Sequence, residues 1–289
     1  MGLAPVSHTR LPPCLDVAWG GPISVLLQQN LRPLPQNRCG LTHHVGHRAN
    51  GRAPAQACAH RRAEALDITN RSAMAALPDQ LPAALNGVVN NAGIIVTGPV
   101  EGLSLDDLTQ QLEVNVISQI AVTQAVLPKI RDAGGRVVFI SSVSGLFTTP
   151  GTGAYNASKY AIEALADALR MELRPWRIPV SLIEPGKIRT DMWGGALDDY
   201  DHLTKQLSEG HRRLYASHLA GTRKLLGRMQ KLAADPKKVT KAVEHALTSR
   251  RPKRRYLLDV VSRLQKSVVA ITPTAAVNDA VLVAATTSK

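Results

Sequence analysis

Tyr155 and Lys159 are the residues whose types and spacing point most directly to chemistry. They lie four apart in the run YNASK, inside a predicted helix over residues 154–173, so their Cβ atoms would be about 5–6 Å apart on one helix face. A tyrosine has a pKa near 10, but a neighbouring ammonium favours the phenolate and lowers that value. The pair therefore predicts a general acid/base, although an exposed helix with an incidental Tyr and Lys would show the same spacing.

Three predicted strand ends place further polar residues near this pair. Ser142 closes the apolar run RVVFISS, residues 88–93 read VVNNAG, and residues 184–186 read EPG, with Thr190 four residues beyond the glycine. In open α/β sheets, ligands bind beyond the carboxyl ends of the strands. Asn115 falls inside a predicted helix, where Asn is mildly unfavourable, so a specific role is expected. A turn serine and a solvent-facing Asn are the alternatives.

The elements that must position these residues alternate between strands and helices. Strands are predicted at 65–68, 87–90, 136–141, 179–183 and 255–258, and helices at 69–77, 104–130, 154–173, 201–232 and 236–248. Such alternation is typical of βαβ units. The fold class expected is therefore α/β, a Rossmann-like, doubly wound parallel sheet in one domain, with an irregular N-terminal portion.

The joint pattern resembles the short-chain dehydrogenase/reductase family. It consists of NNAG (90–93), Asn115, Ser142, YNASK (155–159) and PGKIRT (185–190), in this order and spacing. The resemblance extends over residues 63–260, and the run from Ser142 to Gly186 is similar to the branch that contains retinol and hydroxysteroid dehydrogenases. It implies an NAD(P)-dependent oxidoreductase that interconverts an alcohol and a carbonyl compound by hydride transfer.

The resemblance also implies a role for each matching residue. Tyr155 would be the general acid/base, Lys159 would lower its pKa and hold the nicotinamide ribose, Ser142 would orient the substrate oxygen, and Asn115 would anchor a water in a proton relay. The cofactor, NAD or NADP, would be bound by Asp67, Asn91, Ala92, Gly93, Tyr155, Lys159, Pro185, Gly186 and Thr190. Within that set, Asp67 matches the acid that contacts the adenine and Thr190 matches the residue that binds the carboxamide.

Residues 1–62 depart from the family pattern. The family opens with a strand and a TGxxxGxG turn that binds the pyrophosphate, yet residues 8–20 read HTRLPPCLDVAWG. Only the stretch 23–27 there resembles a strand or a helix start. We hypothesise that this segment is out of frame relative to the rest. If it is genuine, the alternative is a catalytically impaired relative that binds cofactor weakly or not at all. The domain organisation expected is 1–62 atypical, 63–260 catalytic and 261–289 a C-terminal extension.

Charge and composition bear on three other classes of function, namely nucleic-acid binding, metal binding and membrane insertion. The 289 residues carry a net charge of +13, concentrated at both ends. A basic cluster at 250–255 raises the alternative of nucleic-acid binding, but no nucleic-acid motif accompanies it, so no such partner is expected. Cys39, His43, His44 and His47 do not complete a metal-ligand set, so no metal is expected. The absence of an 18-residue apolar run predicts no membrane span, and the N-terminus shows no secretory signal.

The remaining expectations concern substrate, location and assembly. Leu146, Phe147, Met192 and Trp193 flank the expected site and favour an apolar alcohol or carbonyl substrate, or else they are ordinary packing residues of a loop. Three cysteines without a CxxC pair indicate a reduced, cytoplasmic setting. Self-association through the long helices is usual for the resembled family, so a homo-oligomer is a further expectation.

Overall fold

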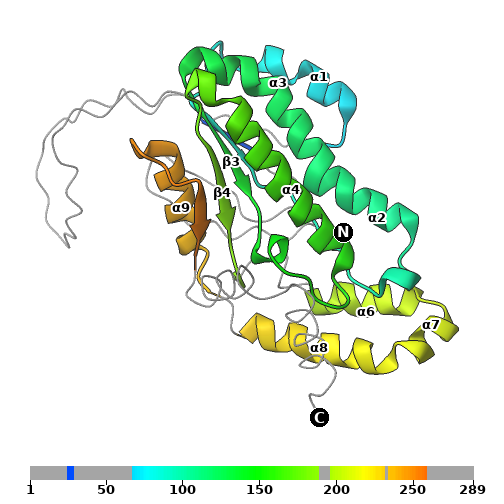
Figure 1. Ribbon diagram of the computed structural model, residues 1–289. Helices are drawn as coiled ribbons and strands as arrows, with labels where there is room; N and C mark the ends of the chain where they lie inside the picture. Colours follow the sequence, from blue (N-terminus) through cyan, green and yellow to red (C-terminus); the bar gives the residue numbers. More distant parts are fainter. Residues whose placement is uncertain (1–24, 29–66, 189–195, 232–233, 259–289) are drawn as a thin grey trace, which may run out of the picture.

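The computed structural model describes residues 25–28, 67–188, 196–231 and 234–258 (Figure 1). In this part of the chain, five strands form one sheet in the order β1-β2-β3-β4-β5. The strands are β1 (Val25–Gln28), β2 (Gly87–Asn90), β3 (Arg136–Ile140), β4 (Val180–Glu184) and β5 (Arg255–Leu257). The pairs from β2 to β5 are parallel, as predicted. β1 pairs antiparallel with β2 and so forms hydrogen bonds with the backbone groups along the outer edge of β2.

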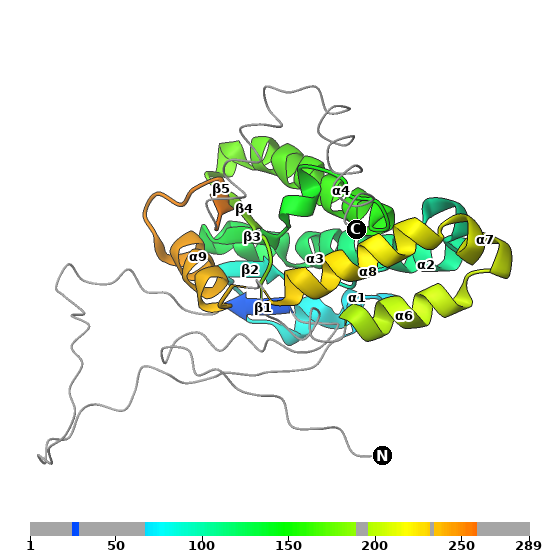
Figure 2. The ribbon, with the colours of Figure 1, turned by 90° about the horizontal axis from the view of Figure 1, so that it is seen from below.

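Helices cover both faces of this sheet, as Figures 1 and 2 show. On one face lie α1 (Arg71–Gln80), α3 (Ser118–Ala133) and α4 (Gly153–Glu172), with α9 (Lys237–Thr248) on the other. Successive strand residues alternate between the two layers: Val137 and Phe139 pack towards α3 and α4, whereas Val138 and Ile140 pack towards α9. Burial on both faces explains why residues 137–140 of β3 are a continuous apolar run and not an alternating one.

A second group of helices lies at the end of the sheet where α4 begins (Figure 1). It comprises α6 (Ala196–Gln206), α7 (Glu209–Leu214) and α8 (Ala216–Lys231). Tyr200 of α6 is buried and donates to the Leu219 carbonyl of α8 at 2.9 Å, which joins the two helices. Tyr215 donates to the Glu101 carboxylate at 2.6 Å and so ties the group to the loop beyond β2.

The predicted helix over 104–130 is correct in position but not in regularity. It begins at Ser104, whose hydroxyl accepts from the Asp107 amide at 3.0 Å, and ends at Gly134, which adopts a left-handed φ of 59°. Between α2 (Leu105–Leu112) and α3, however, the segment η2 (Glu113–Ile117) is a π-helix. π-Helical turns are rare and occur often at functional sites, and this one carries Asn115.

The predicted strand at 65–68 is wrong for the residues that the structure describes there. Ile68 and Thr69 form a turn, and the helix starts at Arg71 with Asn70 as its N-cap. The Asn70 side chain accepts from the Ala73 amide at 3.0 Å. The turn is favoured because the Asp67 carboxylate accepts hydrogen bonds from Thr69, two residues on, which competes with an extended backbone.

Candidate active site

Tyr155 and Lys159 both lie in the first turns of α4 and come together as their spacing predicts. The Lys159 Nζ is 5.6 Å from the centroid of the Tyr155 ring, and only 4% of Lys159 is exposed. The ammonium donates to the Ile140 carbonyl, the last of β3, at 3.0 Å. The long side chain therefore reaches from α4 to the carboxyl end of the sheet, where it holds a positive charge.

Burial governs the protonation of this pair. Desolvation lowers the pKa of Lys159 to about 8, while the negative charge of Glu163 acts in the opposite direction. Desolvation also raises the pKa of Tyr155, and a hydrogen bond with Ser142 partly offsets that effect. The expected lowering of the Tyr155 pKa is therefore not found in the chain alone, because a phenolate loses more solvation in this site than its neighbours restore.

Ser142 lies two residues beyond the end of β3 and is buried there. Its hydroxyl accepts from the Ser144 amide at 3.1 Å, which caps the short helix η3 (Val143–Gly145), and the same hydroxyl acts on Tyr155 by lowering its pKa against the rise that burial causes. The Val143 amide donates to the Pro185 carbonyl at 3.0 Å. The ends of β3 and β4 are thus tied together, and Ser142 lies at the strand end to which the Lys159 ammonium also bonds.

Asn115 joins the loop after β2 to α4. Its Oδ1 accepts from the Ile94 amide at 2.8 Å, and its Nδ2 donates to the Ile94 carbonyl at 3.0 Å and to the Ser158 hydroxyl at 3.1 Å. The residue is fully buried. A fully buried amide with these contacts excludes the solvent-facing alternative, and Ser158 is the immediate neighbour of Lys159.

The NNAG run begins at the last residue of β2, at the carboxyl end of the sheet. Asn90 is fully buried and donates to the Thr123 hydroxyl at 2.9 Å, and the Gln119 side chain donates to the Ala92 carbonyl. Gly93 lies against Asn115, because a Cβ there would be 3.5 Å from its Oδ1. Asn91 and Gly93 are partly exposed at this strand end. The run is therefore braced from α3, which leaves its backbone in a fixed position.

The other predicted cofactor residues are less closely connected. Asp67 is exposed at the start of the described segment, and its carboxylate accepts from the Thr69 amide at 2.9 Å and hydroxyl at 2.7 Å, which lowers the pKa of Asp67. Pro185 and Gly186 are half-buried directly after β4. Thr190 lies outside the described residues, as do Met192 and Trp193. The four residues considered above as metal ligands also lie outside them: Cys39, His43, His44 and His47.

A buried ion-pair network behind the site was not predicted. Arg255 of β5 bonds to Glu163 and Asp167 of α4 and to Glu184 at the end of β4. The sequence offers one signal, since Glu163 follows Lys159 at the helical spacing of four. Arg255 itself gives none, and its place in a basic cluster suggested a solvated or nucleic-acid-binding surface instead.

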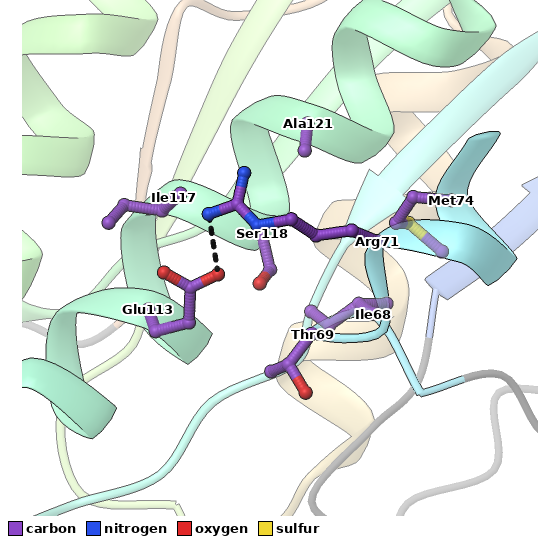
Figure 3. A pocket seen from close by; sticks show the side chains of 8 residues that line it. All are labelled: Ile68, Thr69, Arg71, Met74, Glu113, Ile117, Ser118 and Ala121. Carbon is purple, nitrogen blue, oxygen red and sulfur yellow. Dashed lines mark ion pairs between the residues drawn. The ribbon is translucent and has the colours of Figure 1, made fainter.

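Two cavities lie among the described residues near these elements. One of about 250 Å³ lies between α6, α8 and the loops after β2 and β3, with Val100, Tyr200 and Leu219 in its wall. The other, about 160 Å³, lies between α1 and the helices η2 and α3, and Figure 3 shows Arg71 reaching across it to Glu113 at 3.7 Å. None of the four candidate catalytic residues lines either cavity.

Comparisons with known proteins agree with this geometry. The profile of the short chain dehydrogenase family matches residues 45–201, more than half of the chain. The chain belongs to the short-chain dehydrogenase/reductase family. It is 39% identical to a retinol dehydrogenase of Rattus norvegicus over 175 residues, covering 59% of this chain and 55% of that protein. An uncharacterised oxidoreductase of Escherichia coli is 40% identical over 179 residues, covering 62% and 60%.

A solved structure shares the fold. A short-chain dehydrogenase from Streptomyces avermitilis superposes with a TM-score of 0.58 at 27% identity, covering 71% of this chain and 72% of that one. The chain spans somewhat more than half the length of the curated relatives above. In the part of the chain that the structure describes, no group of His, Cys, Asp and Glu is arranged to hold a metal, and no helix has the length and apolarity that a membrane crossing needs.

Proposed function

We propose that this protein is an NAD(P)-dependent oxidoreductase that interconverts an alcohol and a carbonyl compound, with Tyr155 as its general acid/base. One observation carries the proposal: the Lys159 ammonium, bonded to the Ile140 carbonyl at the carboxyl end of β3, lies 5.6 Å from the centroid of the Tyr155 ring, and the nearby Ser142 hydroxyl lowers the pKa of that phenol against the rise that burial causes. A proton donor, a hydroxyl that can orient a carbonyl oxygen and a buried cation are the parts that this chemistry needs.

The described residues fit the nicotinamide half of the cofactor. An ammonium has three donors, and one of those on Lys159 is taken by the Ile140 carbonyl, which leaves donors for ribose hydroxyls. The partly exposed backbone at Asn91 and Gly93 borders the same strand ends. The bound cofactor would supply the hydride acceptor or donor and a positive ring when oxidised. The residues expected to hold the pyrophosphate lie outside the described residues.

Each side chain then has one task. In carbonyl reduction Tyr155 gives its proton to the substrate oxygen, and in alcohol oxidation it takes that proton back. Ser142 orients the oxygen by a hydrogen bond. Lys159 stabilises the phenolate that forms, and Asn115 keeps the loop at Ile94 and the helix at Ser158 in fixed positions. The raised pKa of Tyr155 favours the protonated phenol, which is the form that carbonyl reduction requires.

Either nicotinamide cofactor is compatible with what is known of similar proteins. A 32% identical relative from Ornithobacterium rhinotracheale is an NADPH-dependent 3-dehydrocapnine reductase. Two Burkholderia short chain dehydrogenases of the same fold, 19% and 22% identical, were solved with NADP and with NAD respectively. We therefore propose NAD or NADP as cofactor and residues 63–260 as the catalytic unit, although the family match begins upstream, at residue 45.

An apolar alcohol or carbonyl compound is the proposed substrate. Leu146 and Phe147 are half-buried in the turn that follows Ser142. Two relatives are named retinol dehydrogenases, and retinol is an apolar alcohol, which agrees with this class of substrate.

Replacement of the phenol tests the function. Tyr155→Phe removes only the hydroxyl, so oxidation of NADH or NADPH with a panel of apolar ketones and aldehydes should fall about 10³-fold in kcat. Tyr160→Phe is the matched control, because Tyr160 is 39% exposed on the same helix and should retain wild-type turnover. Cofactor fluorescence separates the alternative of an impaired protein, which would show no saturable binding. Full turnover by Tyr155→Phe would contradict the proposal.

A further inference from the structure

Four polar residues form a row along α4. Tyr155, Lys159, Glu163 and Asp167 follow one another at intervals of four, which places them on one side of the helix. Exposure increases towards the end of the row: the side chain of Glu163 is 9% exposed and that of Asp167 is 39% exposed. The row thus leads from the candidate active site to the surface, and its third member is a buried carboxylate without a part in the chemistry described so far.

Arg255 holds Glu163 in this position. The guanidinium of this β5 residue bonds to the Glu163 carboxylate, to that of Asp167 at 2.6 Å, and to Glu184, which is fully buried at the end of β4. One cation therefore faces three carboxylates. Because a buried carboxylate is costly without compensation, the excess negative charge needs further cations, and Lys159 and Arg170 are the next ones along α4.

Glu163 also supports the turn that carries Ser142. Gly145 packs on α4 so closely that a Cβ there would be 2.8 Å from the Glu163 Cγ and 3.0 Å from the Lys159 carbonyl oxygen. The turn Val143–Gly145 starts from Ser142, whose hydroxyl caps it. The methylene groups of Glu163 are thus part of the surface on which this turn lies, one helical turn from the ammonium of Lys159.

The electrostatic surroundings of Lys159 make this carboxylate the nearest compensating charge on its helix. Burial lowers the pKa of Lys159 and the charge of Glu163 raises it. Burial raises the pKa of Glu163, and the negative charge of Glu184 on β4 raises it further. Arg255 of β5 lowers it. From η2, Glu113 pairs instead with Arg71, and Tyr155 is uncharged in its protonated form.

We propose that Glu163 is a positioning residue for the reaction: held by Arg255, it keeps the buried Lys159 side chain a cation and seats the turn that carries Ser142. The inference rests on the proposed function for its catalytic meaning, but not for its test. A cationic Lys159 favours the phenolate of Tyr155, so Glu163 acts on the phenol through the lysine and touches neither substrate nor cofactor.

The ionisation of Lys159 in the protein without cofactor tests this directly. With lysine labelled by carbon-13 at Cε, the resonance of Lys159, assigned through Lys159→Met, should titrate with a midpoint near 8 in the wild type. Glu163→Gln is isosteric and removes the charge, so the midpoint should fall by about one pH unit. Asp167→Asn is the matched control: it removes another carboxylate from Arg255, but one that is two turns away and exposed, so the midpoint should stay within about 0.3 pH units of the wild type.

Two further measurements keep the outcome decisive. If Glu163→Gln does not fold, the wild-type Lys159 resonance should still show a second step at the pH where the labelled Glu163 carboxyl titrates, and its absence overturns the proposal. In turnover, the rising limb of kcat/KM for alcohol oxidation should move to higher pH in Glu163→Gln, whereas a purely structural role would lower the rate at every pH. An unchanged Lys159 midpoint in Glu163→Gln, or an equal fall in Asp167→Asn, also overturns it. Because Tyr155→Phe tests the function separately, failure of either proposal can be recognised alone.

Discussion

The catalytic half and the nucleotide half of the candidate site are built differently. Ser142, Lys159 and Asn115 are at most 8% exposed, and Lys159 and Asn115 each bond to a residue of another element. Asp67, the described residue expected at the adenine, is exposed and bonds to Thr69, two residues further on. Geometry in the first half is therefore determined by tertiary packing, whereas at Asp67 it is determined by the local chain. Substitutions in the two halves should have correspondingly unequal effects.

Replacement of Lys159 should have the largest effect on stability, because its ammonium is a charge buried in the catalytic half of the site. A shift of its pKa from 10.5 to about 8 corresponds to about 3 kcal/mol, at about 1.36 kcal/mol per unit. Between pH 8 and 10.5 the unfolded chain binds more protons than the folded chain at this residue, so its contribution makes wild-type stability rise with pH.

Lys159→Met should remove this dependence. We compare the free energies of unfolding of the variant and the wild type, measured in urea at each pH. The variant's advantage over the wild type should be about 3 kcal/mol larger at pH 7 than at pH 10. Arg170→Met, on the same helix but partly exposed, should leave the pH dependence of unfolding as in the wild type. Parallel curves for Lys159→Met and the wild type would mean that the ammonium is solvated, and the contrast between the two halves would be lost.

Asn115 should show the next largest effect. Asn115→Ala leaves the Ile94 amide without its partner, whereas the Ile94 carbonyl still accepts from Gln111 and the Ser158 hydroxyl still donates to the Tyr155 carbonyl. An orphaned buried donor costs about 1–3 kcal/mol. We expect a loss of about 2–3 kcal/mol in the free energy of unfolding, measured in urea. Glu113→Gln is the control from the same π-helix; its ion pair with Arg71 is exposed, so its effect should stay within about 0.5 kcal/mol. Equal losses in both variants would count against a special role for Asn115.

These contrasts also explain what the sequence could predict. The strand β3 contains a continuous apolar run bounded by turn residues, and the helix at Ser104 has a capping box, so local chemistry alone identifies them. The family motifs place Tyr155 and Lys159 on one helix face, which the structure confirms.

Features that depend on partners distant in the chain were missed. The π-helix at Glu113–Ile117 has no sequence signature, and its Asn115 bonds to residues 21 and 43 positions away. Arg255 joins Glu163 across 92 residues, and its charge resembles that of its exposed neighbours. The raised pKa of Tyr155 in the chain without cofactor was missed for the same reason, because the spacing of Tyr and Lys says nothing of how deeply the fold buries them.

Asp67 should show the smallest effect, and it tests the nucleotide half. Asp67→Asn keeps an oxygen that can accept from the Thr69 amide and hydroxyl, so the turn should persist and the Kd for NADH should change less than about threefold, since a neutral hydrogen bond contributes about 1 kcal/mol. Asp67→Ala removes the acceptor and should weaken NADH binding about fivefold. Fluorescence titration measures both, and thermal unfolding should show little change because the group is exposed. If Asp67→Ala binds NADH as tightly as the wild type, Asp67 takes no part in binding the adenine. A loss far beyond fivefold would instead show that this half depends on Asp67 as closely as the catalytic half depends on Asn115.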